Sequence, residues 1–494
     1  MGDSGIFCPL WDMEGIFYKI RPQITEIIIK LLKNNLKIER FLISFTIQII
    51  ILKKPLSFIL VFFFGLSAIS QNYSLPNSKK KDKINFQLVN NLVIIPVSIN
   101  GKELSFILDT GASHTLLFSL TDIDSLEIKD VSKVKIRGMG SEGLIDALKS
   151  KNNTVAIGDT KALAQTLYVV YDETVSLSPK MGVPIHGVIG YDFLKDFVVE
   201  TNYNRQKLIV YNPSMYRKKR SRRYAQFKLD FENDRPFINA VITHPENEKE
   251  VRLLLDSGSS DALWLFDEKN GIVADPQNYF NDFLGTGISG AIHGKKSKLE
   301  SLSIGNFSFE NVKVSYPDSS ALKELSFQED RDGSLGGAIL RRFKVVINYP
   351  EETLTLRKNS HYNDPFHYNM AGAVFEQNGL ISVEGYESNG GYSLKPKNNV
   401  TLAGVVEIMV NPILYQFMAP RFVLSEVREN SPVEKAGLKI GDVLISINGK
   451  EAFKFKLYEI NALFSQSREG KRIQMVVSRN GIEMEFRFTL KKVL

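Results

Sequence analysis

The chain has 494 residues, 43% of them apolar and 24% charged, which is typical of a globular protein with room for two to four domains. Much of the net charge of +7 is concentrated in two short runs, "KKKDK" at 79–83 and "RKKRSRR" at 217–223. No aromatic residues alternate with the basic ones in either run. We therefore interpret both as solvated connectors and predict no nucleic-acid partner.

The N-terminal 70 residues have the pattern of a leader. Lys53 and Lys54 precede "PLSFILVFFFGLSAIS", an apolar run that ends in small residues, so we expect signal cleavage near Ser70 or Gln71. This predicts export, to the periplasm of a Gram-negative bacterium, with residues 71–83 as a linker. The alternative is an uncleaved anchor at residues 41–66, which would associate the protein with the inner membrane. Because the only cysteine, Cys8, precedes the exported part, that part has no disulfide framework and no cysteine nucleophile.

The next 290 residues or so contain an internal repeat. "FILDTGASHTLLF" at 106–118 and "LLLDSGSSDALWL" at 253–265 lie 147 positions apart and both read as strand, aspartate-containing loop, strand. "VIGYDFLKDFVVETNYNRQKLIVY" at 188–211 pairs in the same way with "SLGGAILRRFKVVINYPEETLTLR" at 334–357. A repeat of this length predicts two copies of one β-rich lobe. We place lobe 1 at 84–212, a basic linker at 213–223 and lobe 2 at 224–360.

A glycine-rich motif occurs at the same place in each lobe. "GMGSEG" at 138–143 and "GTGISG" at 285–290 both fit the three-glycine pattern of dinucleotide-binding proteins. That pattern needs a helix that starts at the glycines, whereas both motifs lead back into a strand-like stretch. We therefore predict the tip of a β-hairpin in each lobe.

The repeated aspartates, Asp109 and Asp256, are the candidate catalytic residues. If the lobes pack about a pseudo-twofold axis, the two carboxyl groups meet at about 3 Å and share one proton, which provides a base and an acid in one place. Thr110 and Ser257 could hydrogen-bond across the axis, and Gly111 and Gly258 permit tight turns. The alternative is that both aspartates only form turns at hairpin ends. No zinc-binding histidine pair and no Gly-x-Ser-x-Gly motif occurs, so we predict no metal and no cofactor.

These motifs resemble those of aspartic peptidases, and the short lobes are more similar to bacterial retropepsin-like proteins than to pepsin. The resemblance implies a mainly β fold of two pseudo-twofold-related lobes, with Asp109 and Asp256 as the catalytic dyad in the cleft. It also implies flaps that bind substrate, formed by Gly138, Met139, Gly140, Gly285, Gly287 and Ile288. The flaps lack the tyrosine of pepsin-type enzymes. The residue three past the aspartate is Ala112 in one lobe and Ser259 in the other, and a serine hydroxyl there would lower the pKa of the dyad.

Residues 366–494 break the repeat and resemble a PDZ domain, a small β-barrel with helices. The resemblance rests on "SPVEKAGLKIGDVLISINGK" at 431–450, the strand "FVLSEV" at 422–427 and the helical stretch "KLYEINALFSQ" at 456–466. It implies a peptide groove between that strand and that helix. The residues expected in the groove are Phe422, Val423, Leu424, Leu457 and Ile460. We expect a carboxylate-binding loop just before Phe422 and an insertion at roughly 376–415.

Together these features predict an exported aspartic endopeptidase whose dyad activates water to hydrolyse peptide bonds. Its partners would be peptides or unfolded proteins as substrates, and a peptide ligand of the PDZ domain that recruits substrate or regulates the enzyme. The alternative is a peptide-binding or scaffolding protein whose lobes bind without cutting.

Overall fold

The computed structural model describes residues 72–118, 120, 123–140, 143–171, 175–218, 221–244, 247–266, 278–322, 331–387, 392–396, 406–410 and 413–494. The chain divides into two compact units, Met1–Ile69 and Ser70–Leu494. The predicted signal at 1–70 and its alternative, the anchor at 41–66, lie outside the described residues. Among the helices that are described, none is both long and apolar enough to cross a membrane.

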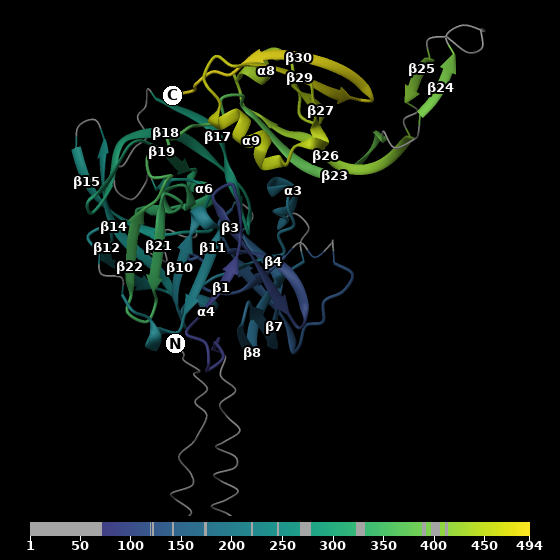
Figure 1. Ribbon diagram of the computed structural model, residues 1–494. Helices are drawn as coiled ribbons and strands as arrows, with labels where there is room; N and C mark the ends of the chain where they lie inside the picture. The colour runs from purple at the N-terminus through teal and green to yellow at the C-terminus, as the bar shows by residue number, and fades with distance from the viewer. Residues whose placement is uncertain are drawn as a thin grey trace, which may run out of the picture. The chain divides into compact units, whose positions relative to one another are not determined.

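Within the described ranges, each lobe is built on an eight-stranded sheet, and the strand order is equivalent in both lobes (Figure 1). In lobe 1 the order is β2 (Gln87–Val89), β3 (Leu92–Ile99), β4 (Lys102–Leu108), β9 (Gly187–Ile189), β5 (Leu116–Leu117), β8 (Thr160–Val170), β7 (Leu144–Ile157) and β6 (Val131–Arg137). In lobe 2 it is β13 (Asp230–Glu232), β14 (Arg235–His244), β15 (Asn247–Leu255), β20 (Gly333–Leu335), β16 (Leu263–Leu265), β19 (Phe307–Pro317), β18 (Gly290–Ile304) and β17 (Tyr279–Gly287). The sequence repeat is therefore a repeat of strand topology.

A third sheet joins the lobes. Its order is β1 (Lys81–Asn85), β11 (Lys207–Tyr211), β10 (Val198–Asn202), β21 (Phe343–Asn348), β22 (Thr353–Lys358) and β12 (Ala225–Lys228). The antiparallel pairing of β10 with β21 connects strands from the two lobes. Buried apolar side chains of both lobes form one continuous cluster with this sheet. The lobes are thus fused through backbone hydrogen bonds and a common core.

Two lobe boundaries differ from the prediction. Residues 71–83 are not a linker throughout, because β1 starts at Lys81 and the buried ring of Tyr73 packs edge-on against Phe193 at 5.2 Å. At the other end, lobe 2 extends past residue 360. The guanidinium of Arg342, only 2% exposed, donates to the carbonyls of Tyr362 and Asp364 and stacks on Phe366 at 3.8 Å. A buried charge needs these partners, so residues 361–366 belong structurally to lobe 2.

The C-terminal domain has its own sheet and core. The strand order is β23 (Ala373–Glu387), β26 (Ile413–Val427), β27 (Val443–Ile447), β29 (Arg472–Arg479) and β30 (Ile482–Thr489), with β28 (Lys450–Glu451) beside β27. Helices α8 (Pro432–Ala436) and α9 (Leu457–Gln466) pack on this sheet. The Ser431 hydroxyl caps α8, and Gly437, at φ +96°, ends it in the left-handed conformation that glycine adopts most easily. The predicted insertion extends β23 and β26 as a long hairpin, which leads to β24 (Tyr392–Pro396) and β25 (Val406–Val410) (Figure 1).

Short helices occur at the connections between strands. They are α3 (Ser178–Met181), α4 (Tyr191–Leu194), α6 (Ser319–Leu322) and α7 (Gly337–Leu340), with 3₁₀ turns at Tyr203–Arg205, Pro213–Met215 and Ala452–Lys454. α4 and α7 occupy equivalent places, directly after β9 and β20. The prediction of a mainly β fold is confirmed.

Candidate active site

Asp109 and Asp256 occupy equivalent positions at the ends of two central strands. β4 lies between β3 and β9, and β15 lies between β14 and β20, so each aspartate leaves a strand that is paired on both sides. The backbone amide of Asp109 donates to Ile189 at 2.9 Å, and that of Asp256 donates to Leu335 at 3.0 Å. These matching hydrogen bonds fix the two loops in the same way.

Gly111 and Gly258 allow the two aspartates to approach each other. A Cβ atom on Gly258 would lie 2.4 and 2.6 Å from the carboxylate oxygens of Asp109. One on Gly111 would lie 3.4 Å from Cγ of Asp256. The glycine amides also donate to the aspartate of their own loop, at 2.7 Å for Asp109 and 2.9 Å for Asp256. The structure thus brings the two carboxyl groups together, and they are hydrogen-bonded to each other.

Thr110 and Ser257 bind the two loops together through buried hydrogen bonds. The Ser257 hydroxyl donates to the Leu108 carbonyl at 2.7 Å and accepts from the Thr110 amide at 3.0 Å. In the mirror arrangement, the Thr110 hydroxyl donates to the Leu255 carbonyl and accepts from the Ser257 amide at 2.9 Å. Both hydroxyl residues are less than 10% exposed. Each lobe therefore completes the hydrogen bonding of the other lobe's loop.

The dyad is electrostatically asymmetric. Burial, and then the charge of Asp256, raise the pKa of Asp109 to about 7. Burial also raises the pKa of Asp256, but the Arg331 guanidinium and the amides of Gly258 and Ser259 oppose this rise. Asp109 has opposing contacts of the same kinds, the Gly111 amide and the Arg235 guanidinium, but Arg235 is the weakest cause at Asp109 whereas Arg331 is the strongest opposing cause at Asp256. Because positive charge favours an ionised carboxyl group, we infer that the shared proton is held mainly by Asp109.

The source of this asymmetry differs from the sequence-based expectation. The comparison of Ala112 with Ser259 suggested that a serine hydroxyl would act on the dyad. The hydrogen bond that Ser259 gives Asp256 comes from its backbone amide, which an alanine would also provide. Arg331, 4% exposed, was not anticipated, because it lies 75 positions after Asp256 and no motif marks it.

Two hairpins meet at their tips, the first flap (β6 and β7) and the second flap (β17 and β18). The amide of Ser289 in the second flap donates to the Met139 carbonyl of the first at 3.0 Å. The Ser289 hydroxyl accepts from the Gly138 amide at 3.2 Å and donates to the Gly143 carbonyl at 2.8 Å. Ser289 is fully buried, so the flap tips form a closed contact. Sequence reasoning missed Ser289, because a single serine in a turn carries no distinctive signal.

The flap contact explains three of the six glycines in the two motifs. A Cβ on Gly140, whose φ is +138°, would lie 2.0 Å from the Ser289 carbonyl oxygen, and one on Gly287 would lie 1.9 Å from that of Met139. A Cβ on Gly138 would lie 2.9 Å from Cβ of Ile288. Only glycine fits at such approaches. Gly285 is different, since a Cβ there meets nothing within 4 Å.

The structure places the residues expected in the PDZ groove elsewhere. Phe422, Val423 and Leu424 belong to β26, which is paired with β23 on one side and with β27 on the other. A peptide cannot add to a strand that already has two neighbours. Leu457 and Ile460 are at most 1% exposed and point into the core of the domain.

Within the described residues, β23 and β30 are the two end strands of this sheet, and α9 lies beside β23. The face of α9 that remains open carries Tyr458, Asn461, Ala462 and Ser465. The loop that precedes the edge strand is therefore "NMAG" at 369–372, rather than the stretch before Phe422. Among the described residues, no group of three or more His, Cys, Asp or Glu side chains is arranged to bind a metal ion.

Comparisons with known proteins identify two parts of the chain. Residues 95–193, which include Asp109, match the family model described as aspartyl protease, and residues 391–490 match that of the PDZ domain. No curated protein matches the chain. A solved aspartic proteinase from Irpex lacteus matches at 14% identity over 57% of this chain and 99% of its own, with a TM-score of 0.33, which is too low to support an argument.

The class of protein defined by these findings is a mainly β protein with an aspartyl protease domain and a PDZ domain. Lobe 2 repeats the strand order of the matched lobe and supplies the second aspartate. The chain is accordingly a two-lobed protein similar to aspartic peptidases, with a PDZ domain at its C-terminal end, and this composition supports a protease or peptide-binding role.

Proposed function

We propose that the protein is an exported aspartic endopeptidase. The observation that supports this most directly is the pair of carboxyl groups, Asp109 and Asp256, held in contact by reciprocal hydrogen bonds between their loops. A structural turn does not require two partly buried acids at one point, since bringing them together raises the pKa of at least one of them. Strongly perturbed carboxyl groups at the meeting point of two lobes are typical of a catalytic site.

In the proposed mechanism the two aspartates have different roles. Asp256, which Arg331 and two amides stabilise as an anion, takes a proton from a water molecule as that water attacks the peptide carbonyl. Asp109 holds the shared proton and donates a hydrogen bond to the oxyanion that develops. It then transfers that proton toward the departing nitrogen, so that the dyad ends with one proton, as it began.

The flaps would close over the bound peptide. Their tips hydrogen-bond to each other through Ser289, so substrate entry requires these bonds to open. Closure excludes water other than the attacking molecule and provides backbone groups to an extended substrate. The PDZ domain would recruit or regulate substrates, and residues 1–70 would direct export. The N-terminal sequence of the protein recovered from its native compartment tests export, because cleavage predicts a new terminus at Gln71 and an anchor predicts a retained leader.

Peptide cleavage by purified variants tests the activity. Asp109→Asn and Asp256→Asn should each reduce kcat by at least about a thousandfold, and the double variant should lose little more, because the two residues act as one unit. Ser303→Ala, a substitution far from the dyad loops in sequence, serves as a control and should keep full activity. A single variant that retains more than about a tenth of the activity would contradict the dyad. If the unmodified protein binds unfolded polypeptides but never cuts them, the scaffolding alternative is correct.

A further inference from the structure

A large cavity in the described part of the protein is lined by residues of both the peptidase lobes and the PDZ domain. It has a volume of about 1080 Å³. One wall starts at Asn91 and Ser260, which are joined by a hydrogen bond of 2.8 Å, and Ser260 lies only four residues after Asp256. A second wall is the base of the second flap at residues 282–284. The cavity therefore reaches the loop that carries Asp256.

The opposite wall is the PDZ groove. Val374 of the edge strand β23 lines the cavity, together with Tyr458, Asn461 and Ser465 on the open face of α9. Within the described residues β23 is paired only with β26, so its other edge is available next to the cavity. α3 of lobe 1 also lies against β23, so part of this strand is already in contact with lobe 1.

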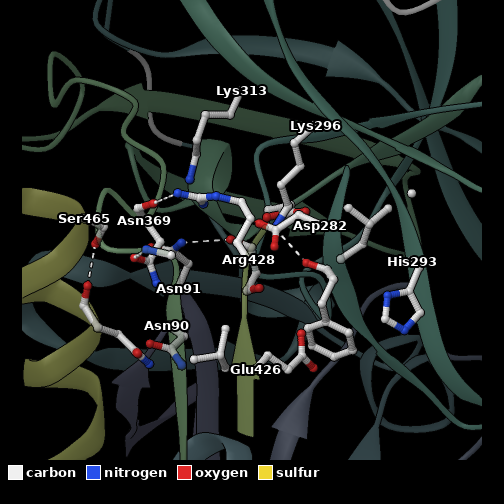
Figure 2. A pocket seen from close by; sticks show the side chains of 18 of the residues that line it. Asn90, Asn91, Asp282, His293, Lys296, Lys313, Asn369, Glu426, Arg428 and Ser465 are labelled. Carbon is white, nitrogen blue, oxygen red and sulfur yellow. Dashed lines mark hydrogen bonds and ion pairs between the residues drawn. The ribbon is translucent and has the colours of Figure 1, made fainter. Parts of the chain in front are cut away.

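The loop before β23 is not arranged to receive a terminal carboxylate. The Asn369 side-chain oxygen accepts from the amides of Ala371 at 3.1 Å and Gly372 at 2.9 Å. Arg428 donates to the Asn369 backbone carbonyl at 3.0 Å and holds the loop in place, as Figure 2 shows. Two amides of this loop are thus already bonded to the Asn369 side chain, so they do not point to a terminal carboxylate of a ligand. The groove is therefore better suited to an internal segment of a bound polypeptide than to its C-terminus.

Charged groups on the cavity walls compensate one another to a large extent. Lys296 pairs with Asp282 at 3.1 Å (Figure 2), and Arg341 pairs with Asp364 at 3.0 Å. Recognition here would therefore depend mainly on the backbone of the incoming chain. Strand addition uses main-chain hydrogen bonds and tolerates many sequences.

We propose that one polypeptide occupies both sites, so that a chain held at the dyad continues past Ser260 into the cavity and adds as a strand to β23. This rests on the proposed function and makes the substrate class more specific. The preferred substrate is an unfolded polypeptide that extends well beyond the cleavage point on one side. The PDZ domain is then a second binding site for the chain that is being cut, rather than a site for a separate ligand.

The test measures binding to the inactive full chain, Asp256→Asn, so that it does not depend on cleavage. The probes are a fluorescent peptide that fills the cleft and versions of it extended at the amino or the carboxyl end with about eight mixed residues, roughly 26 Å of extended chain. We expect extension at one end only to lower Kd by about tenfold or more, from three or four added backbone hydrogen bonds. Ala462→Arg, which places a long charged side chain in the groove, should abolish that gain. Gln474→Arg, on an exposed position of β29, should keep it.

The outcomes separate the two proposals. Three results would overturn the proposal that one polypeptide occupies both sites. They are no gain in affinity from extension at either end, an equal gain in affinity at both ends, and a gain in affinity that persists in Ala462→Arg. Cleavage of the short peptide by the unmodified chain decides the proposed function independently. The Ala462→Arg chain must bind the unextended peptide normally, which shows that the substitution leaves the lobes intact.

Discussion

Removal of the Ser257 hydroxyl should weaken the junction between the lobes far more than an ordinary serine substitution does. In Ser257→Ala, the Leu108 carbonyl loses its donor at 2.7 Å and the Thr110 amide loses its acceptor at 3.0 Å. Leu108 is 3% exposed and Thr110 is 4% exposed, so water does not readily replace the hydroxyl. Each buried polar group left without a partner costs about 1–3 kcal/mol, so the two groups together give a loss of roughly 2–6 kcal/mol of unfolding free energy.

Urea unfolding followed by tryptophan fluorescence measures this loss. The chain has two tryptophans, and in a Trp11→Phe background the buried Trp264 of lobe 2 reports alone. Trp264 is well placed for this purpose because its indole donates at 2.7 Å to Asp261, five residues after Asp256. Ser303→Ala is the matched control, since its hydroxyl makes only an exposed contact of 3.2 Å with Ser308. We expect the control to change the unfolding free energy by less than about 0.5 kcal/mol.

Thr110→Ala should show a similar loss, because its hydroxyl has the mirror-image partners. The double variant should lose less than the sum of the two, since water that enters after the first substitution also solvates the second site. A Ser257→Ala loss below about 1 kcal/mol, or one equal to that of Ser303→Ala, would show that these hydrogen bonds do not hold the lobes together.

Three further predictions follow from the dyad, the flaps and the boundary of lobe 2. Because burial and Asp256 raise the pKa of Asp109 to about 7, kcat/KM should fall as the pH rises through that value and the pair loses its shared proton; a profile that stays flat up to about pH 9 would exclude this assignment. Gly140→Ala should raise KM for peptides, because its Cβ would lie 2.0 Å from the Ser289 carbonyl oxygen, whereas Gly285→Ala, with open space around it, should not; equal effects would refute the flap contact. A chain that ends after residue 360 should be less stable than one that ends after residue 367, by about 3 kcal/mol in the Trp264 assay, because it removes the partners of the buried Arg342; equal stability would place the boundary where the sequence suggested it.

The repeat was the part of the fold that could be predicted most completely from the sequence. The apolar runs at 106–108 and 253–255, directly before Asp109 and Asp256, are buried at every position, so both copies have the same pattern. Gly258 was equally readable, because a Cβ there would lie 2.3 Å from Cγ of Asp109, and a Cβ on Gly111 would be in tight contact with Leu254 and Asp256. Where the backbone lies this close to a side chain, few residue types fit, and the role of such positions can therefore be predicted from the sequence.

The position of the peptide groove in the PDZ domain could not be predicted from the sequence in the same way. The strand containing Phe422 is apolar because it lies in the interior of the sheet, but an edge strand with one buried face has a similar composition. The long hairpin between β23 and β26 also separates the true edge strand from the recognisable motif at 431–450. On α9, Leu457 and Ile460 were predicted to line the peptide groove because they are apolar. In the structure these two residues face the core, and the more polar face of α9 is open. Strand order depends on long-range pairing, which a single sequence does not display.

The two lobes share a topology but differ in what contacts them, and this difference gives lobe 2 a distinct role. Arg331 of lobe 2 acts on Asp256, which favours the proton on the aspartate of lobe 1. The second flap also packs against the PDZ domain, since Arg428 lies 5.0 Å from the Phe280 ring and Tyr368 contacts the same ring edge-on at 5.1 Å. A change in the position of the PDZ domain would reach the second flap through Phe280, and lobe 1 through α3, which lies against β23. Tyr458 of the PDZ domain also packs on the apolar cluster that contains Ile145 of the first flap. Both lobes therefore contact the PDZ domain, but through different elements.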